Sequence, residues 1–163
     1  GHLMDMEIAM DGKSVTILET RFLWPNFSGA PEKFNQAPKP NASIEIDPRF
    51  VPNLENMGFR IRNLPPKDGF EDDRGLYVLG VKASYGGIAD PKVILLIADP
   101  EKPPTEWTRR ALNANDIGEL DRLMVSYVDI TFRPYHYRTF VTAYIDSMYV
   151  VINPDRLMLK YGV

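Results

Sequence analysis

Hydrophobic and polar residues alternate with a period of two along most of this chain, which is the pattern of half-buried β-strands. Residues 41–47 show it most clearly, because Ile44 and Ile46 fall on one face of an extended strand while Ser43 and Glu45 fall on the other. Alternation and enrichment in β-branched and aromatic residues predict further strands over 14–24, 59–64, 76–85, 92–98, 125–132 and 140–152. We expect the last two to form a hairpin.

Helical signals occur in two places. Asp47 is a suitable N-cap, Pro48 suits the first helical position and Gly58 is a stop signal, so a short helix is predicted between them. A second helix is predicted over residues 111–124, with Asn115 as its N-cap. Its apolar residues recur at helical spacing: Ile117, Leu120, Leu123 and Met124.

These elements predict a mainly β fold, namely an OB-fold-like five-stranded small β-barrel with extra strands and one or two short helices. A chain of 163 residues is long enough for one core and too short for two independent domains. We therefore expect one domain over residues 4–163, alone or as a small homo-oligomer. Residues 1–3 precede Met4 and match an expression-tag scar.

Composition excludes several classes of protein. The net charge is −3, which argues against indiscriminate binding to nucleic acid, although an acidic protein can carry a basic groove. The chain has no cysteine, so disulfides and thiolate metal sites are excluded. Its longest apolar run, residues 93–98, is too short to cross a bilayer. We expect a cytoplasmic protein without a membrane partner.

Two stretches combine aromatic residues with cations beside residues that block helix formation: residues 21–34 and 132–138. Flat rings and nearby cations suit an unpaired base and its phosphate. The candidate nucleic-acid-binding residues are those of these stretches together with cations and a tyrosine in or beside predicted strands. They are Arg21, Trp24, Phe27, Lys33, Phe34, Lys39, Arg60, Arg62, Lys82, Tyr85, Arg133, Tyr135, Tyr137 and Arg138.

Each candidate also has a structural interpretation. At least one of Phe22 and Trp24 should be buried in the core, since they share a strand face. A loop rich in proline and glycine does not easily bury Phe27 and Phe34, although one of them could fix the loop to the barrel. Arginines at alternate strand positions are as consistent with a solvated sheet face as with a groove that follows a nucleic-acid backbone.

The residues offer little for catalysis. His136 is the only histidine outside the tag scar, and no phosphate-binding glycine loop or metal-ligand spacing occurs. Asp121 and Asp129 could be ligands of Mg²⁺ in a nuclease, but no pattern pairs them. We therefore expect a protein that is not an enzyme and has no cofactor or bound metal.

The order of these residues resembles that of single-stranded-DNA-binding proteins encoded by tailed bacteriophages. The similarity runs from about residue 20 to residue 161. The residues that carry it are Arg21-Phe22, Asn26-Phe27-Ser28-Gly29, Lys33-Phe34-Asn35, Asn41, Gly58-Phe59, Val128-Asp129-Ile130, Phe132, Pro134-Tyr135, Thr142-Ala143-Tyr144-Ile145, Ser147-Met148-Tyr149 and Lys160-Tyr161.

The resemblance implies an OB-fold that protects unpaired DNA during phage replication or recombination, with residues 21–34 and 133–138 in contact with the DNA. Replication proteins such as a polymerase or a helicase are then further candidate partners. Many such proteins end in an acidic tail that recruits these partners, whereas this chain ends in Leu-Lys-Tyr-Gly-Val163. The alternative is a structural or protein-interaction β-barrel of a phage, whose aromatic loops form a protein interface.

Overall fold

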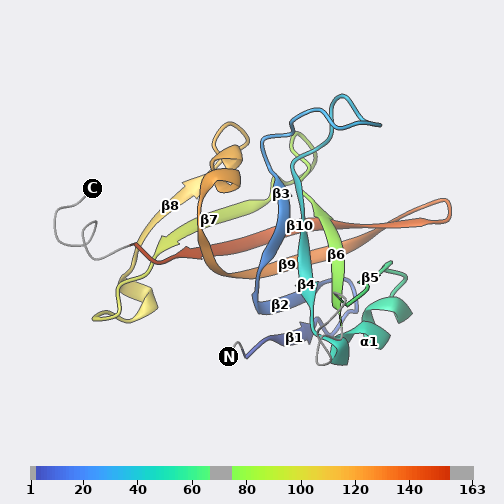
Figure 1. The fold of residues 1–163 in the computed structure, drawn as a ribbon, viewed down its shortest axis with the longest axis horizontal. Helices are drawn as coiled ribbons and strands as arrows, with labels where there is room; N and C mark the ends of the chain where they lie inside the picture. Colours follow the sequence, from blue (N-terminus) through green and yellow to red (C-terminus); the bar gives the residue numbers. More distant parts are fainter. Residues whose placement is uncertain (1–2, 67–74, 155–163) are drawn as a thin grey trace.

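The structure is a computed structural model that describes residues 3–66 and 75–154. In these parts of the chain, ten strands join in one connected sheet, accompanied by one α-helix and three 3-10 helices (Figure 1). The strands are β1 (Asp5–Ile8), β2 (Val15–Thr20), β3 (Phe22–Asn26), β4 (Asn41–Ile46), β5 (Arg62–Leu64), β6 (Leu76–Lys82), β7 (Lys92–Ile97), β8 (Thr108–Leu112), β9 (Val125–Tyr137) and β10 (Phe140–Ile152). The helices are η1 (Pro48–Phe50), α1 (Val51–Asn56), η2 (Pro104–Glu106) and η3 (Ile117–Arg122).

Five stretches of the chain curl into a partly open barrel: β2 with β3, β9, β10, β6 and β4. The strand order is β1-β2-β9-β10-β6-β4-β3, in which β6 and β10 are parallel. β2 pairs with β9 and β3 pairs with β4, yet only Arg21 separates β2 from β3 in the chain. The sheet therefore returns to the stretch of chain from which it began, without a ladder that closes it. The predicted mainly β fold with a few short helices is confirmed, but the sheet of the described residues does not close into the predicted small barrel.

A bend explains why the strand predicted over residues 14–24 is two strands. The ladder between β2 and β9 is irregular between Ile17 and Thr20, and Glu19 has a positive φ of 57°. The Asp129 carboxylate on β9 accepts the Glu19 N–H at 2.8 Å, and the Thr20 hydroxyl donates to the Glu45 carbonyl at 2.6 Å. These two bonds hold the chain where it leaves β9 and joins β4.

The core fills the inside of the barrel with residues from alternate strand positions. Ile44 and Ile46 are buried there, as the alternation predicted, while Ser43 and Glu45 lie on the opposite face of β4, where Ser43 is also largely buried. The largest fully buried side chains come from most of the barrel strands and from the helices: Phe27, Phe132, Ile17, Ile44, Ile46, Leu54, Ile117, Leu120, Ile130, Met148, Val15 and Val78.

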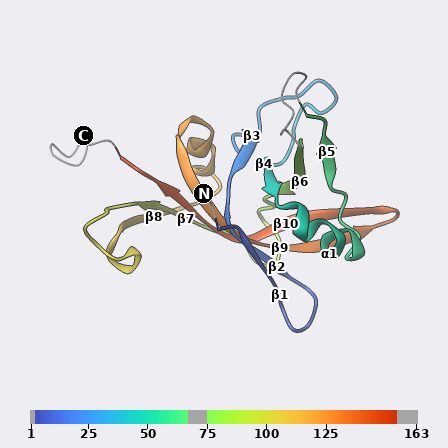
Figure 2. The ribbon, with the colours of Figure 1, turned by 60° about the horizontal axis from the view of Figure 1, so that its bottom comes forward.

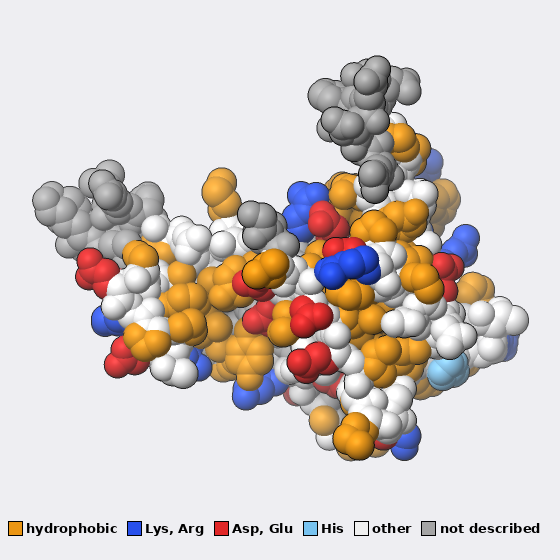
Figure 3. All heavy atoms as spheres, turned by 90° about the horizontal axis from the view of Figure 1, so that it is seen from below, with side chains coloured by type: hydrophobic (Ala, Val, Ile, Leu, Met, Phe, Trp, Pro, Cys, Tyr) orange, Lys and Arg blue, Asp and Glu red, His pale blue; other side chains and the backbone are white. Residues whose placement is uncertain are grey.

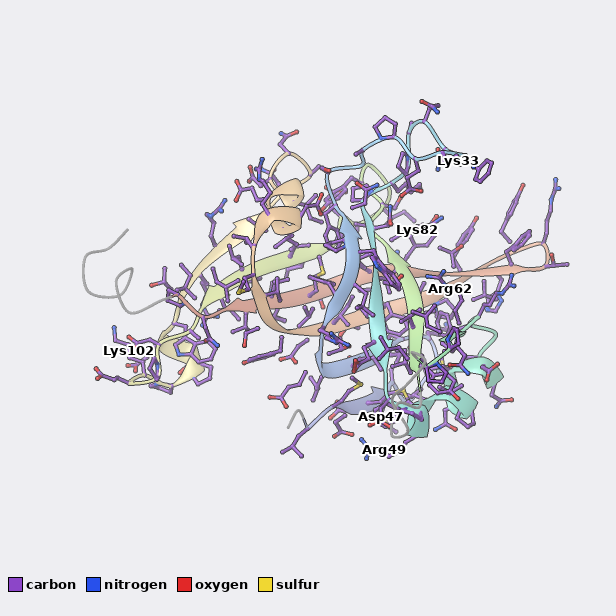
Figure 4. The ribbon with its side chains drawn as sticks, viewed as in Figure 1. Lys33, Asp47, Arg49, Arg62, Lys82 and Lys102 are labelled. Atoms are coloured by element: carbon purple, nitrogen blue, oxygen red, sulfur yellow. The ribbon has the colours of Figure 1, made fainter. Side chains whose placement is uncertain are left out.

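The first predicted helix is confirmed as η1 followed by α1. The Asp47 side chain accepts the Arg49 N–H at 2.9 Å and caps η1, and the two side chains also form an ion pair (Figure 4). The hydrogen bond from the Arg49 side chain lowers the pKa of Asp47 below its ordinary value. Val51 begins α1 directly after η1, and Met57 is its C-cap.

The second predicted helix, over residues 111–124, is wrong. Leu112 is the last residue of β8 and pairs with Val93, and only Ile117–Arg122 is helical, as η3. Asn113 causes the change of direction, because its side chain accepts the N–H groups of Asn115 and Asp116 and forms a turn. The spacing of Ile117 and Leu120 suits a 3-10 helix as well as an α-helix.

Other strands differ from the prediction in length. Residues 59–61 lie outside β5, whereas β9 and β10 extend to a tight turn at residues 138–139, so the hairpin is longer than expected. Pro134 is tolerated in β9 because it lies beyond Phe132, the last residue of β9 that pairs with β2. β1 was not predicted. The polar and acidic sequence of residues 65–75 lies mostly outside the described residues, as do Lys160 and Tyr161.

The molecule extends from the barrel in two directions. The turn end of β9 and β10 projects beyond β6 on one side, and β7 and β8 lie at the opposite end (Figures 1 and 2). Hydrophobic side chains gather over the β7–β8 part when the molecule is seen from below (Figure 3). A small second cluster lies there, made of Leu96, Ala98 and Val151 with Trp107, Tyr127 and Tyr149 among its partners. None of the described helices is long and apolar enough to span a membrane.

Candidate nucleic-acid interface

The outer face of β4 and β6 forms the floor of a groove. Ala42, Ile44, Leu79 and Val81 point into the core, so the alternate residues point outward. Asn41 lies opposite Lys82, and Ser43 lies opposite Gly80. The absence of a side chain at Gly80 leaves the middle of the floor open. The groove has a volume of about 550 Å³ and is lined by Asn41, Ala42, Ser43, Arg60, Arg62, Leu79, Gly80, Val81, Lys82, Val141, Thr142 and Ala143.

Three cations from two predicted strands, 59–64 and 76–85, meet at this groove. Arg60 and Arg62 approach from the side of β5, and Lys82 lies at the end of β6. The Arg62 guanidinium donates to the Ser43 hydroxyl at 3.4 Å. Within residues 3–66 and 75–154, none of the three cations forms an ion pair with a carboxylate. No carboxylate of the described residues therefore neutralises these three charges.

Aromatic rings continue this surface onto β10 and β9. Tyr144 lies next to Lys82 across the parallel β6–β10 pair, and its ring contacts that of Tyr135 edge-on, with the centroids 5.7 Å apart. Tyr135 is 53% exposed and Tyr137 is 56% exposed. Lys39 joins them, because its ammonium group lies 5.3 Å from the Tyr144 ring and donates to the Ser84 hydroxyl at 3.0 Å. Lys82 on β6, Tyr144 on β10 and Tyr135 on β9 thus follow one another on this surface, with Lys39 beside Tyr144.

The loop of residues 27–40 lies at one end of this surface. Phe34 is 92% exposed and the Lys33 ammonium group lies 5.3 Å from its ring. Figure 4 shows Lys33, Lys82 and Arg62 in the same half of the molecule, whereas Lys102 lies at the opposite end. Phe27 is a correction to the predicted site: it is 1% exposed and its ring contacts Phe22 in the core, so it holds the loop and cannot stack a base.

The turn of the β9–β10 hairpin forms the other end. Arg138 occupies the turn with a positive φ of 54°, and its guanidinium lies 5.3 Å from the Tyr137 ring. Phe140 pairs with Tyr137 across the hairpin and is exposed. Arg133 forms an ion pair with Asp146, so part of its charge is already neutralised.

The remaining predicted residues lie apart or have other partners. Arg21 forms an ion pair with Glu45 at 2.9 Å. Trp24 is exposed on β3 with a positive φ of 51°, whereas Phe22 is only partly buried and packs against the core, so neither residue is fully buried, contrary to expectation. Tyr85 is partly buried: its ring packs against the core, and burial raises the pKa of its hydroxyl.

Sequence reasoning missed Tyr144, Ser43, Thr142 and Phe140. Each stands at an outward position of a strand that was predicted, so alternation could have identified the face. The sequence does not indicate that this face of residues 140–144 lies beside Lys82, because the parallel β6–β10 pairing joins residues about 60 positions apart.

The carboxylates considered for a metal site bind backbone groups instead. Asp121 accepts the N–H groups of Phe27 and Ser28, and Asp129 accepts that of Glu19. Burial raises the pKa of Asp129 above its ordinary value, an effect that the bond from Glu19 opposes. Among the described residues no three histidine, cysteine or acidic side chains are grouped so that they could hold a metal ion.

Comparison with known proteins gives one family and several similar structures. The family model of the phage ssDNA-binding domain matches residues 7–163. The single-stranded DNA-binding protein of bacteriophage Enc34 in a C-terminally truncated form is 15% identical, with a TM-score of 0.50 over 95% of this chain and 94% of that chain. The untruncated Enc34 protein is 16% identical, with a TM-score of 0.48 over 85% and 80% of the two chains. No curated protein matches the sequence. At these identities the likeness of structure concerns the fold.

Proposed function

We propose that this chain, which belongs to the family of phage single-stranded-DNA-binding domains, binds single-stranded DNA without sequence preference. The DNA lies along the surface from the groove over β4 and β6 to the β9–β10 hairpin. Arg60, Arg62 and Lys82 neutralise phosphate groups in the groove. Tyr135 and Tyr137 stack bases along the hairpin. Phe34 and Lys33 contact the strand from the loop of residues 27–40.

The observation that supports this proposal is the continuity of the surface. Lys82 on β6, Tyr144 on β10 and Tyr135 on β9 follow one another across three strands, and Arg62 and Lys39 lie at the margins. Sequence-tolerant proteins combine a basic groove that follows the backbone with rings on which bases stack. OB-folds bind oligonucleotides on this kind of strand face and on the two loops that flank it.

The rings and the cations have different energetic roles. Each stacked base contributes about 1–3 kcal/mol and tolerates any base, because every base has a flat face. Each phosphate contact releases counterions, so the logarithm of the binding constant should fall with the logarithm of salt concentration, by about 0.7 for each contact with a single strand. Rings thus determine preference for unpaired DNA, and cations determine the salt dependence.

A fluorescence-anisotropy titration tests the proposal. The labelled probe is a strand of about thirty nucleotides, single or annealed to its complement, at two salt concentrations. Tight, salt-sensitive binding to the single strand alone is expected. Binding that does not change with salt would contradict the role of the cations. No binding to either probe would contradict the proposal and favour a protein-interaction barrel.

A matched pair of lysines sharpens the test. Lys82→Ala removes a groove cation, whereas Lys102→Ala removes an exposed lysine at the opposite end of the molecule (Figure 4). Lys82→Ala should reduce the salt slope by about 0.7 for the lost phosphate contact. Lys102→Ala should leave the slope unchanged. Equal effects of the two substitutions would show that the overall charge, not the groove, determines binding.

The biological setting follows from the same proposal. A protein that covers unpaired DNA without a chemical step would serve phage replication or recombination in the host cytoplasm, where polymerase or helicase are candidate partners. Copies that bind side by side along one strand would also meet one another. Copurification with the replication proteins of a phage and sedimentation of the protein on long single strands test these two expectations.

A further inference from the structure

Asp121 forms a bridge between η3 and the first residues of the loop of residues 27–40. One carboxylate oxygen accepts the Phe27 N–H at 2.7 Å, and the other accepts the Ser28 N–H at 2.9 Å. Hydrogen bonds to an ionised carboxylate are stronger than those between neutral groups. Both oxygens are used on consecutive amides, so the carboxylate determines the position and the direction in which the chain leaves the barrel.

Two further contacts hold the same point. The Phe27 side chain is buried in the core, and η3 lies directly against Ser28. A Cβ atom at Gly118 of η3 would lie 3.1 Å from the Ser28 Cα, closer than most such contacts. The first turn of the loop is therefore fixed by a buried ring, a pair of charge-assisted bonds and close backbone packing.

The fixed point is connected to the exposed tip by bonds within the loop. The Asn26 side chain accepts the Ala30 N–H at 2.9 Å and donates to the Glu32 carboxylate at 3.0 Å. Glu32 and Asn35 then exchange backbone hydrogen bonds of 2.7 and 3.2 Å around Lys33 and Phe34. A displacement at Phe27 and Ser28 would therefore be transmitted to the exposed ring.

We infer that Asp121 is a positioning residue for DNA binding, which holds Phe34 and Lys33 at the end of the interface without contacting the nucleic acid itself. This inference rests on the proposed function. An ordered loop loses less conformational freedom on binding than a free one, so the bridge raises affinity even though it makes no contact with DNA.

A double-mutant cycle between Asp121 and Phe34 tests the inference. Phe34→Ala alone should weaken single-strand binding about tenfold, as the loss of one stacked base, and Asp121→Ala should weaken it by a similar factor. In the Asp121→Ala background, Phe34→Ala should add less than about twofold, because a displaced ring no longer stacks. Tyr135→Ala should have its full effect in both backgrounds. A full additional loss on Phe34→Ala would overturn the inference.

Two controls separate this role from a loss of stability. Asp116, at the N-cap of the same 3-10 helix, makes no capping bond with its side chain, so Asp116→Ala should leave affinity unchanged. Asp121→Asn keeps the size of the side chain but presents only one oxygen to the two amides, and it replaces Asp121→Ala in the cycle if the alanine variant does not fold. Thermal unfolding of each variant shows that the protein titrated is folded.

Hydrogen exchange provides a readout that does not require DNA. The amides of Phe27 and Ser28 should exchange faster in the Asp121 variants, while those of the β9–β10 ladder stay protected. Unchanged exchange at the two amides would overturn the bridge. If the wild-type protein fails to bind single strands, the proposed function fails, and with it the role of Asp121 in binding, even where exchange shows that the bridge exists.

Discussion

The two aromatic segments that flank the proposed interface are held in different ways. The β9–β10 hairpin carries Tyr135 and Tyr137 on a long antiparallel ladder, which runs from the pair Tyr137–Phe140 to the pair Val125–Ile152 with two register shifts. The loop of residues 27–40 carries Lys33 and Phe34 outside any such ladder, and it is joined to the barrel by the contacts of Phe27, Ser28 and Asp121.

The difference shows that similar composition does not imply similar mechanical support. A hairpin shares its support among many backbone hydrogen bonds, so one side chain can be removed while the ladder remains. A loop held by a few side chains can be displaced by one substitution far from its tip. Ring deletions should therefore act locally on the hairpin, whereas changes at the base of the loop should act at a distance.

The largest effect is expected for Phe27→Ala. Removal of a fully buried phenylalanine costs about 3–5 kcal/mol of the free energy of unfolding, because it leaves a cavity and loses the contact with Phe22. It should also weaken DNA binding through the loop. Chemical denaturation measures the first effect and anisotropy the second. A loss below about 1 kcal/mol would show that the loop is not anchored by this ring.

Removal of the hairpin rings should weaken DNA binding and have little effect on stability. Tyr135→Ala and Tyr137→Ala should each weaken binding by about 1–3 kcal/mol, as expected for stacked bases. The free energy of unfolding should change little, because more than half of each side chain is exposed. Titration and denaturation of the double variant check both statements. Unfolding of that variant would show that the rings support the fold.

A smaller effect is expected at Gly118, where space is limited by the loop itself. Gly118→Ala places a methyl group about 3.1 Å from the Ser28 Cα, so the loop or η3 has to move. Overpacking of this kind costs about 1–3 kcal/mol of the free energy of unfolding. The matched control is Gly80→Ala in β6, where an added Cβ meets no atom within 4 Å. Equal destabilisation by both variants would exclude close packing at Ser28 as the cause.

The smallest effect concerns Asp129 on β9, whose carboxylate holds the bend at the end of β2 through the Glu19 N–H. Burial raises the pKa of this carboxyl, so the folded state binds its proton more tightly than the unfolded state. Stability is therefore lost as pH rises above the ordinary carboxyl pKa of about 4 through the raised value. Asp129→Asn retains an acceptor for the Glu19 N–H, and it should be more stable than wild type at neutral pH by less than about 1 kcal/mol.

Asp47 provides a control of opposite sign. The bond from Arg49 lowers the pKa of Asp47, so its contribution is present above the ordinary carboxyl pKa and is lost as pH falls through the lowered value. Thermal unfolding of Asp129→Asn and Asp47→Asn between pH 3 and 7 should therefore give differences from wild type of opposite sign at neutral pH. Differences of the same sign would contradict the assignment of Asp129 as a carboxyl destabilised by burial.

Much of the local structure could be predicted from the sequence, because it depends on neighbouring residues. Alternation located β4, apolar and β-branched residues located β7 and the whole of β10, and the order Asp47-Pro48 located the first helix with its cap. The aromatic and cationic stretches could also be recognised in the sequence, since rings and cations next to helix-blocking residues are unusual in an acidic chain. The helix expected at residues 111–124 failed because apolar spacing alone does not distinguish a strand, a turn and a 3-10 helix in succession.

The class of fold and most of the cations and rings of the proposed interface could thus be recognised from local sequence patterns. Which of these side chains meet depends on how the strands pair. The parallel pairing of β6 with β10 brings Lys82 to Tyr144, burial removes Phe27 from the surface, and the backbone bonds of Asp121 explain a carboxylate that the sequence left ambiguous. The physical reason is that alternation depends on adjacent residues, whereas these contacts depend on strand pairings and burial between residues far apart in the chain.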